Sequence, residues 1–92
     1  MTRMVHKYEM PEPGKSIKHM IPDIRWPRFV QMQGNKIMLW CEVILFGQET
    51  KETAMEFFTI GTGHPIPPET QYLGTVMDEL YVWHVFGKPA RH

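Results

Sequence analysis

The segment from Lys36 to Phe46 is the strongest constraint on how this 92-residue chain can fold. Side chains on a β-strand alternate between two faces. One face of this segment would carry Ile37, Leu39, Cys41, Val43 and Leu45, and the other Met38, Trp40, Ile44 and Phe46. Between Ile37 and Phe46 the only charge is Glu42. The pattern predicts a central strand covered on both faces by a sandwich, a barrel or a dimer interface.

Two hairpins are predicted from turn residues between apolar runs. Gly34-Asn35 separates the strands Arg28–Gln33 and Lys36–Phe46, which is the spacing of a tight hairpin turn. A second hairpin joins Gln71–Val76 to Glu79–Phe86 around Met77-Asp78. Further strands are predicted at Met4–Glu9, Ser16–Ile21 and Met55–Ile60. Residues 23–27 are predicted to be a loop because Pro22 and Pro27 cannot donate to a sheet.

Eight prolines and seven glycines divide the chain into short runs, as is typical of all-β proteins. No window of 12 or more residues keeps a helical period, and residues 48–56 are interpreted as a polar loop. We therefore expect an all-β fold, or a β-rich one with at most one short helix. The architecture would be a small antiparallel sandwich or a partly open barrel built of hairpins. One domain would span residues 1–92, with frayed ends at 1–3 and 88–92.

The single cysteine, Cys41, excludes an intramolecular disulfide and lies in an apolar run, which favours a buried thiol in a reducing compartment. The N-terminal residues lack the apolar region of a secretion signal, and no apolar stretch approaches the roughly 20 residues that span a bilayer. These features predict a cytosolic protein with no membrane contact. A domain this small buries a modest share of its surface, so a homo-oligomer is expected.

Charge is unevenly distributed along a chain whose formal net charge is zero. Residues 1–36 contain seven basic and three acidic side chains, whereas residues 37–92 contain three basic and seven acidic ones. This division would create a basic face for an anionic ligand. The favoured interpretation is that the two halves interleave in the fold and their charges cancel. The neutral total argues against binding to long nucleic acid.

The stretch Gly61-Thr62-Gly63-His64 is the most suggestive candidate binding loop. Its glycines would let a ligand approach the backbone, while Thr62 and His64 offer hydrogen bonds. Adjacent N–H groups in such a loop can form an anion-binding nest. A purely structural turn is the equally weighted alternative.

A second candidate site combines cations with an aromatic ring in Arg25-Trp26-Pro27-Arg28. Such a group can stack a base and hold a phosphate, although the same side chains can also lie along a sheet edge. A small anionic ligand such as a nucleotide would be bound by the Gly61–His64 loop, with Arg25, Trp26 or Arg28 supplying charge and stacking. His84, beside Trp83, is interpreted as a hydrogen-bonded core or pocket histidine.

Signatures of metal, cofactor or catalytic sites are weak. No pair of histidines has the short spacing of zinc ligands, and one cysteine gives no thiolate cluster. Gly14-Lys15-Ser16 lacks the earlier glycine and the following helix of a phosphate-binding loop. A Cys41–His84 pair is conceivable, but a reactive cysteine needs an accessible, electropositive setting. We expect no metal, no cofactor and no enzymatic activity, with a small hydrolase as the least favoured alternative.

Several sequence blocks together resemble a widespread small family from bacteriophages and prophages, known only as a domain of unknown function. The blocks are His6-Lys7-Tyr8-Glu9-Met10, Val30–Gly34 followed by Leu39-Trp40, Phe58–His64, Tyr72–Thr75 and Val82–Phe86. The resemblance spans residues 5–87. It departs at Pro22-Asp23-Ile24, where similar proteins carry a Pro-x-Gly-Ala turn. It implies a phage origin and a single compact domain, and it implies no activity.

The leading hypothesis is therefore a non-enzymatic phage protein that acts in the host cytoplasm. It would sequester or block a host defence component, either a host protein or a small nucleotide signal. The alternative is a structural or assembly accessory protein of the phage particle.

Overall fold

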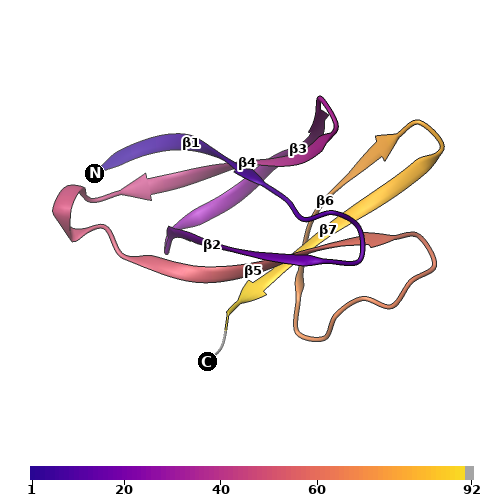
Figure 1. The fold of residues 1–92 in the computed structure, drawn as a ribbon. Coiled ribbons are helices and arrows are strands. Elements are labelled where there is room, and N and C mark those ends of the chain that lie inside the picture. Colours follow the sequence, from indigo (N-terminus) through magenta and orange to yellow (C-terminus); the bar gives the residue numbers. More distant parts are fainter. Residues whose placement is uncertain (91–92) are drawn as a thin grey trace.

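A computed structural model of the chain describes residues 1–90 and contains seven strands in two antiparallel sheets (Figure 1). The three-stranded sheet has the order β1-β4-β3, with β1 at Thr2–Glu9, β4 at Lys36–Leu45 and β3 at Arg25–Gln33. The four-stranded sheet has the order β2-β5-β7-β6, with β2 at Ser16–Pro22, β5 at Glu52–Gly61, β7 at Tyr81–Pro89 and β6 at Gln71–Asp78. A 3-10 turn, η1, at Gly47–Glu49 is the only helical element among residues 1–90. The predicted all-β class is confirmed.

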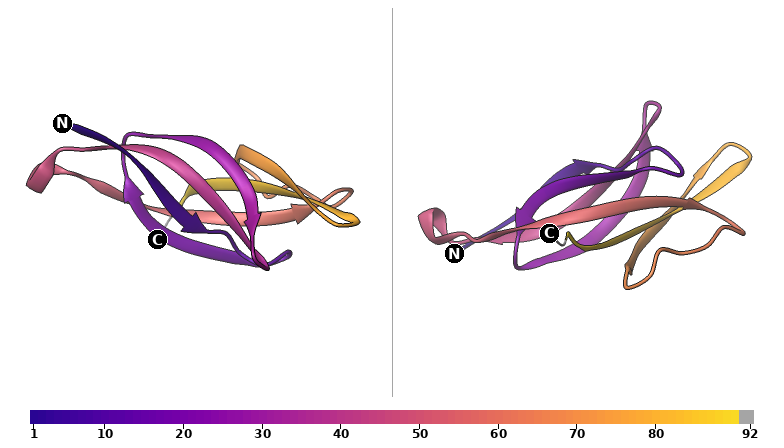
Figure 2. Two further views of the ribbon diagram at one scale, coloured as in Figure 1. Left: turned by 90° about the horizontal axis from the view of Figure 1, so that it is seen from above. Right: turned by 60° about the horizontal axis from the view of Figure 1, so that its bottom comes forward.

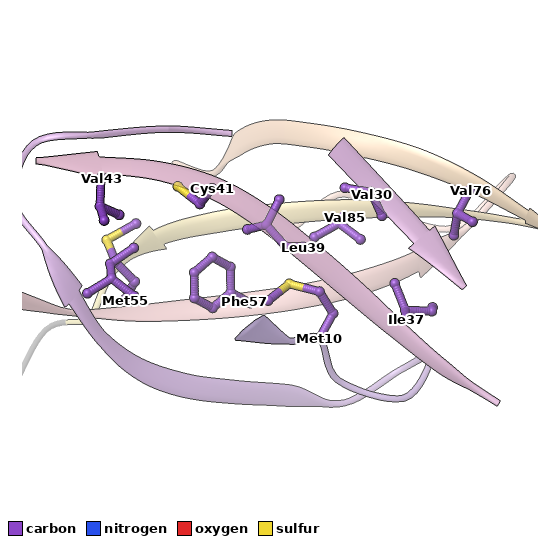
Figure 3. Close-up of a cluster of buried hydrophobic side chains, with 11 residues drawn as sticks. Met10, Val30, Ile37, Leu39, Cys41, Val43, Met55, Phe57, Val76 and Val85 are labelled. Carbon is purple, nitrogen blue, oxygen red and sulfur yellow. The ribbon is translucent and has the colours of Figure 1, made fainter. Parts of the chain in front are cut away.

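The two sheets form two layers around one core (Figure 2). The inner face of β4 contributes four buried side chains, which are Ile37, Leu39, Cys41 and Val43. Figure 3 shows them gathered with Met55 and Phe57 of β5, Val76 of β6 and Val85 of β7. Full burial of a side chain of this size contributes about 1.5–3 kcal/mol. The contact between the layers therefore holds the domain together.

The sheets approach most closely where β3 crosses β6. A Cβ atom at Gly74 would fall inside the van der Waals contact distance of the Val30 side chain. Only a glycine lets the two strands come this close. Val30 is itself buried in the core, so this corner fixes how the three-stranded sheet lies on the four-stranded one.

The first predicted hairpin is confirmed, whereas the turn of the second lies two residues further along. β3 and β4 meet at Gly34-Asn35, and Gly34 has the positive φ of +63° that such turns need. In the second hairpin Asp78 pairs with Tyr81, so the turn is Glu79-Leu80, with a φ of +52° at Glu79. The predicted turn at Met77-Asp78 and the predicted strand start at Glu79 are wrong. Strand pairing with β7 continues past Val76, so Met77 and Asp78 both belong to β6.

Several strands are longer than the sequence predicted. β3 begins at Arg25, so the predicted loop over residues 23–27 is wrong for its last three residues. Pro27 fits because β3 is an edge strand and its register shifts between Pro27 and Phe29. At the predicted frayed ends, Thr2 and Arg3 pair with β4, and Lys88 and Pro89 pair with β5. Residues 91 and 92 lie outside the described residues.

The outer face of β4 lacks a covering layer within the described chain. β4 is central in its sheet, as expected, but Met38, Trp40, Glu42 and Ile44 are only half-buried. Within residues 1–90 no second layer covers this side, because the four-stranded sheet packs on the inner face alone. The four-stranded sheet therefore supplies one of the two expected covers, a dimer interface over the other face stays a prediction, and an apolar surface remains open on the described chain.

The three-stranded sheet is the more basic of the two sheets. The strands of the three-stranded sheet carry five basic and two acidic side chains, against two basic and three acidic ones in the four-stranded sheet. Of the strands in the basic N-terminal part, only β2 joins the other sheet. The two halves of the chain do interleave, since β4 lies between β1 and β3 and β2 pairs with β5, but their charges do not cancel on the three-stranded sheet. No helix among the described residues is long and apolar enough to cross a membrane.

Candidate functional site

The Gly61–His64 loop is a closed turn that also borders a cavity. The His64 N–H donates to the carbonyl of Gly61 at 3.2 Å, and Gly63 has a φ of +91°. Gly61 packs so closely on the Trp83 ring that an added Cβ would lie 3.1 Å from it. Gly61, His64 and Trp83 line a cavity of about 300 Å³ together with Pro13, Gly14, Thr59 and Ile60. The sequence left a structural turn and a binding loop as equal alternatives. The Gly61–His64 loop is a structural turn, and it also forms part of the wall of a cavity.

Among residues 1–90, Thr59 is the one buried polar side chain in the core. It is fully buried on β5, and its hydroxyl has no hydrogen-bond partner within the described protein. Thr59 also lines the cavity beside the loop. A buried hydroxyl without a partner costs about 1–3 kcal/mol of stability.

His84 lies in a chain of hydrogen bonds that ties the loop to the β6–β7 hairpin. Its Nε2 is 2.9 Å from the Thr62 hydroxyl, its Nδ1 is 3.1 Å from the Thr75 hydroxyl, and Thr75 is 2.5 Å from the Tyr72 hydroxyl. Both ring nitrogens are thus engaged, one as donor and one as acceptor in the neutral ring. The group beyond Nδ1 is a hydroxyl, whereas catalytic triads place a carboxylate there to stabilise the imidazolium.

Arg25 faces the core side of its sheet and anchors neighbouring segments. Its guanidinium donates to the carbonyls of Pro22 and Asp23, both at 2.9 Å, and lies 3.0 Å from the sulfur of Met55. These contacts tie the start of β3 to the end of β2 and to β5. Its predicted role as a ligand-binding charge finds no support in this geometry, because its guanidinium already donates hydrogen bonds to two backbone carbonyls.

Trp26 and Arg28 lie on the outer face of the three-stranded sheet. They line a shallow, open depression of the surface with Arg3, Glu42 and Ile44. Glu42 accepts a hydrogen bond from Arg3 at 2.8 Å and lies 3.9 Å from a guanidinium nitrogen of Arg28. The bond from Arg3 is the main cause that lowers the pKa of Glu42, and the charges of both arginines add to it. Glu42 is therefore ionised at neutral pH, and its carboxylate lies beside the guanidinium groups of Arg3 and Arg28.

The same face continues into a cluster of aromatic rings. The ring centroids of Phe29 and Trp40 are 5.7 Å apart, and the Lys7 ammonium lies 5.9 Å from the Trp40 ring centre. Trp26 and Phe29 are 49% and 53% exposed, which is high for such large apolar side chains. We call this surface the aromatic face and define it by Trp26, Phe29 and Trp40 with Arg3, Lys7 and Arg28.

The structure therefore does not gather the predicted site residues in one place. Figure 1 shows the start of β1, which carries Arg3, near η1, and the loop after β5 at the opposite end of the molecule. Trp26 and Arg28 belong to the first end, and Gly61, Thr62, Gly63, His64, Trp83 and His84 belong to the second. Arg25 lies between the layers. Sequence reasoning missed Arg3 and Lys7 as neighbours of the Trp26 surface because it gave no pairing between β1 and β4. It also missed Phe29 and Trp40, although the predicted β3–β4 hairpin places them opposite each other.

Cys41 and His84 belong to different sheets and form no pair. Cys41 is buried on the inner face of β4 and is opposite His6 of β1, whereas both ring nitrogens of His84 are engaged by threonines. Burial raises the pKa of the Cys41 thiol, which keeps it protonated near neutral pH. Among residues 1–90, no three histidine, cysteine or acidic side chains lie together in a way that could hold a metal ion.

Comparison with known proteins identifies a family without assigning an activity. The whole chain, residues 1–92, matches the family described as "Domain of unknown function (DUF7352)", and the chain belongs to it. No curated protein and no solved structure matches the chain. The resemblance to a family of unknown function is thereby confirmed, while a phage origin stays a prediction.

Proposed function

We propose that this member of the family is a small, non-enzymatic binding protein of bacteriophage origin, which sequesters or blocks a host component in the host cytoplasm. The aromatic face is the surface that binds. The observation that carries this proposal is the exposure of Trp26 and Phe29 beside Arg3 and Arg28 on a sheet face that no other layer of residues 1–90 covers. Exposed apolar patches rimmed by polar groups mark interaction sites.

The composition of the aromatic face supports binding over simple solvation. The solvent side of an antiparallel sheet is normally polar. Here the central strand presents Met38, Trp40 and Ile44, and its neighbours add Val5, Trp26 and Phe29. Tryptophan and arginine are also the residues that most often dominate binding energy at interfaces. The aromatic face therefore has both the area and the residue types of a recognition surface.

The total surface of the chain also supports association. Its accessible area is 6313 Å², whereas a folded monomer of 10.9 kDa would expose about 5,600 Å². The excess of roughly 700 Å² approaches the ~800 Å² that each partner buries in a standard interface. The molecule is thin, with extents of 43 × 30 × 16 Å. We propose a homo-oligomer, which light scattering on the purified protein would detect as a mass above that of one chain.

A second candidate function, an assembly accessory of the phage particle, has one observation in its favour. The outer face of the four-stranded sheet also exposes apolar side chains, including Met20, Tyr72 and Met77. A subunit packed between neighbours would use two apolar outer faces. A binding protein that sequesters a ligand needs only the aromatic face for that task.

A capture experiment with matched variants tests the proposed function. Tagged wild-type protein is incubated with host lysate, and recovered proteins and extracted small molecules are identified by mass spectrometry. The face variant is Trp26→Ala/Phe29→Ala, and the control is Tyr72→Ala, which removes an aromatic ring of similar exposure, 55%, from the other sheet. We expect a specific component with the wild type and the control, and its loss with the face variant.

Recovery of the same component by the face variant, checked to be folded by circular dichroism, would contradict the role of the aromatic face. Recovery that depends instead on Tyr72 would favour the assembly function. An empty capture with all three folded proteins would contradict the proposal as a whole.

A further inference from the structure

We infer that the aromatic face binds a small nucleotide of about dinucleotide size, with its bases stacked on Trp26 and Phe29 and a phosphate held between Arg3 and Arg28. This inference rests on the proposed function and names the ligand class of the same surface. It depends on three features of the face: a shared pair of guanidinium groups, two exposed rings beside them, and a local excess of positive charge.

The phosphate site is the open surface depression lined by Arg3, Trp26, Arg28, Glu42 and Ile44. The two guanidinium groups converge on one carboxylate, which leaves one net positive charge at this depression. Arg28 approaches Glu42 only to 3.9 Å, beyond hydrogen-bond distance, so its planar fork stays free to bind a phosphate in two-point fashion. Arg3 is held more firmly, at 2.8 Å, which orients the pair.

The base platforms lie on the same strand as Arg28. Trp26 and Phe29 both point to the outer face of β3, where they are opposite Glu42 and Trp40 of β4. The Trp40 ring supports Phe29 from the side, and Trp26 borders the depression that the two arginines line. A base stacked on Trp26 would therefore bring its phosphate to the arginines. Each base–aromatic stack changes affinity by roughly fivefold to a hundredfold.

The positive charge of the aromatic face favours a small nucleotide over a second copy of this chain or a long nucleic-acid strand. The outer face carries Arg3, Lys7, Arg28 and Lys36 against Glu9 and Glu42. A second copy docked through the same face would bring two basic surfaces together, which is repulsive. A long strand needs many phosphate contacts for tight binding, and the rest of this neutral chain does not supply them. A ligand with one or two bases and few phosphates matches both the charge and the two rings.

Calorimetric titration with the linear dinucleotide pApA tests the inference. We expect saturable binding that weakens as salt is raised. Trp26→Ala and the double variant Arg3→Gln/Arg28→Gln should each weaken it about tenfold or more. The matched controls are Lys15→Gln, a cation as exposed as Arg3 at 71%, and Tyr81→Ala, an exposed ring stacked on Trp83 of the other sheet. Both controls should bind like the wild type.

Adenosine and inorganic phosphate, used separately, should each bind at least tenfold more weakly than pApA, because each engages only one of the two subsites. A single-stranded 20-mer should bind no more tightly per site than pApA. Tighter binding by the 20-mer, or equal losses in the face and control variants, would overturn the inference.

Absence of heat with pApA at well-folded wild-type protein would also overturn the inference, and it can be separated from failure of the proposed function. If the lysate capture still yields a protein that depends on Trp26 and Phe29, the aromatic face binds a protein and only the nucleotide assignment is lost. If that capture is empty as well, both proposals are wrong.

Discussion

The two faces of β4 have nearly the same apolar character and opposite surroundings. Ile37, Leu39, Cys41 and Val43 are buried against the four-stranded sheet, while Met38, Trp40 and Ile44 remain half-exposed on the other side. A two-sheet domain covers each sheet once. When both faces of a strand are apolar, one face therefore packs in the core and the other stays available for a partner.

The largest difference between the two faces should be in stability. Leu39 is only 2% exposed, and Leu39→Ala should cost about 3 kcal/mol in the free energy of unfolding because it opens a cavity in the core. Met38→Ala, one residue away on the outer face, should cost less than half of that. Urea unfolding at neutral pH measures both. Equal losses would mean that the outer face is as well packed as the inner one.

The second largest loss of stability is expected at the close contact between the two sheets. Gly74→Ala places a methyl group against Val30 and should cost about 1–3 kcal/mol, the usual range for overpacking. Val30→Ala should relieve part of that loss when the two changes are combined, because the residues are in direct contact. Additive losses in this double-mutant cycle, again followed by urea unfolding, would show that the sheets do not meet at this corner.

A gain of stability is expected for a substitution at Thr59 of β5, in the sheet that packs against the inner face of β4. Thr59→Val removes a buried hydroxyl that has no partner and keeps the shape of the side chain, so it should raise the free energy of unfolding by about 1 kcal/mol. Thermal unfolding followed by circular dichroism measures the change. A destabilised Thr59→Val protein would indicate that the hydroxyl makes a favourable interaction in solution.

The smallest effect concerns pH and the outer face. Arg3 lowers the pKa of Glu42 below its ordinary value of 4.5, so the ionised carboxylate stabilises the fold above that pH. The contribution is lost as pH falls through the lowered pKa of the folded state. The pair is exposed on its arginine side, so the effect should be small. Glu42→Gln should flatten the acid limb of the curve of stability against pH, and an unchanged acid limb would contradict the ion pair.

The sequence was most informative where structure is local. Gly34-Asn35 was enough to predict the β3–β4 hairpin, because the turn and both strands are adjacent in the chain. The pairing of β1 with β4 joins Arg3 to Glu42 across 39 residues, and no short pattern encodes it. Trp26 and Arg28 were identified as candidates, yet Arg25 was grouped with them. Extending the strand through Pro27 would have placed Arg25 on the opposite face.

The most direct test of the account uses the three tryptophans as reporters. Trp26 and Trp40 lie on the aromatic face, whereas Trp83 borders the loop cavity of the other sheet. In a ¹H–¹⁵N correlation spectrum each indole N–H gives its own signal during titration with pApA. We expect the Trp26 and Trp40 signals to move together while the Trp83 signal stays in place. Movement of the Trp83 signal alone would place the ligand at the Gly61–His64 loop and contradict the aromatic face as the binding surface.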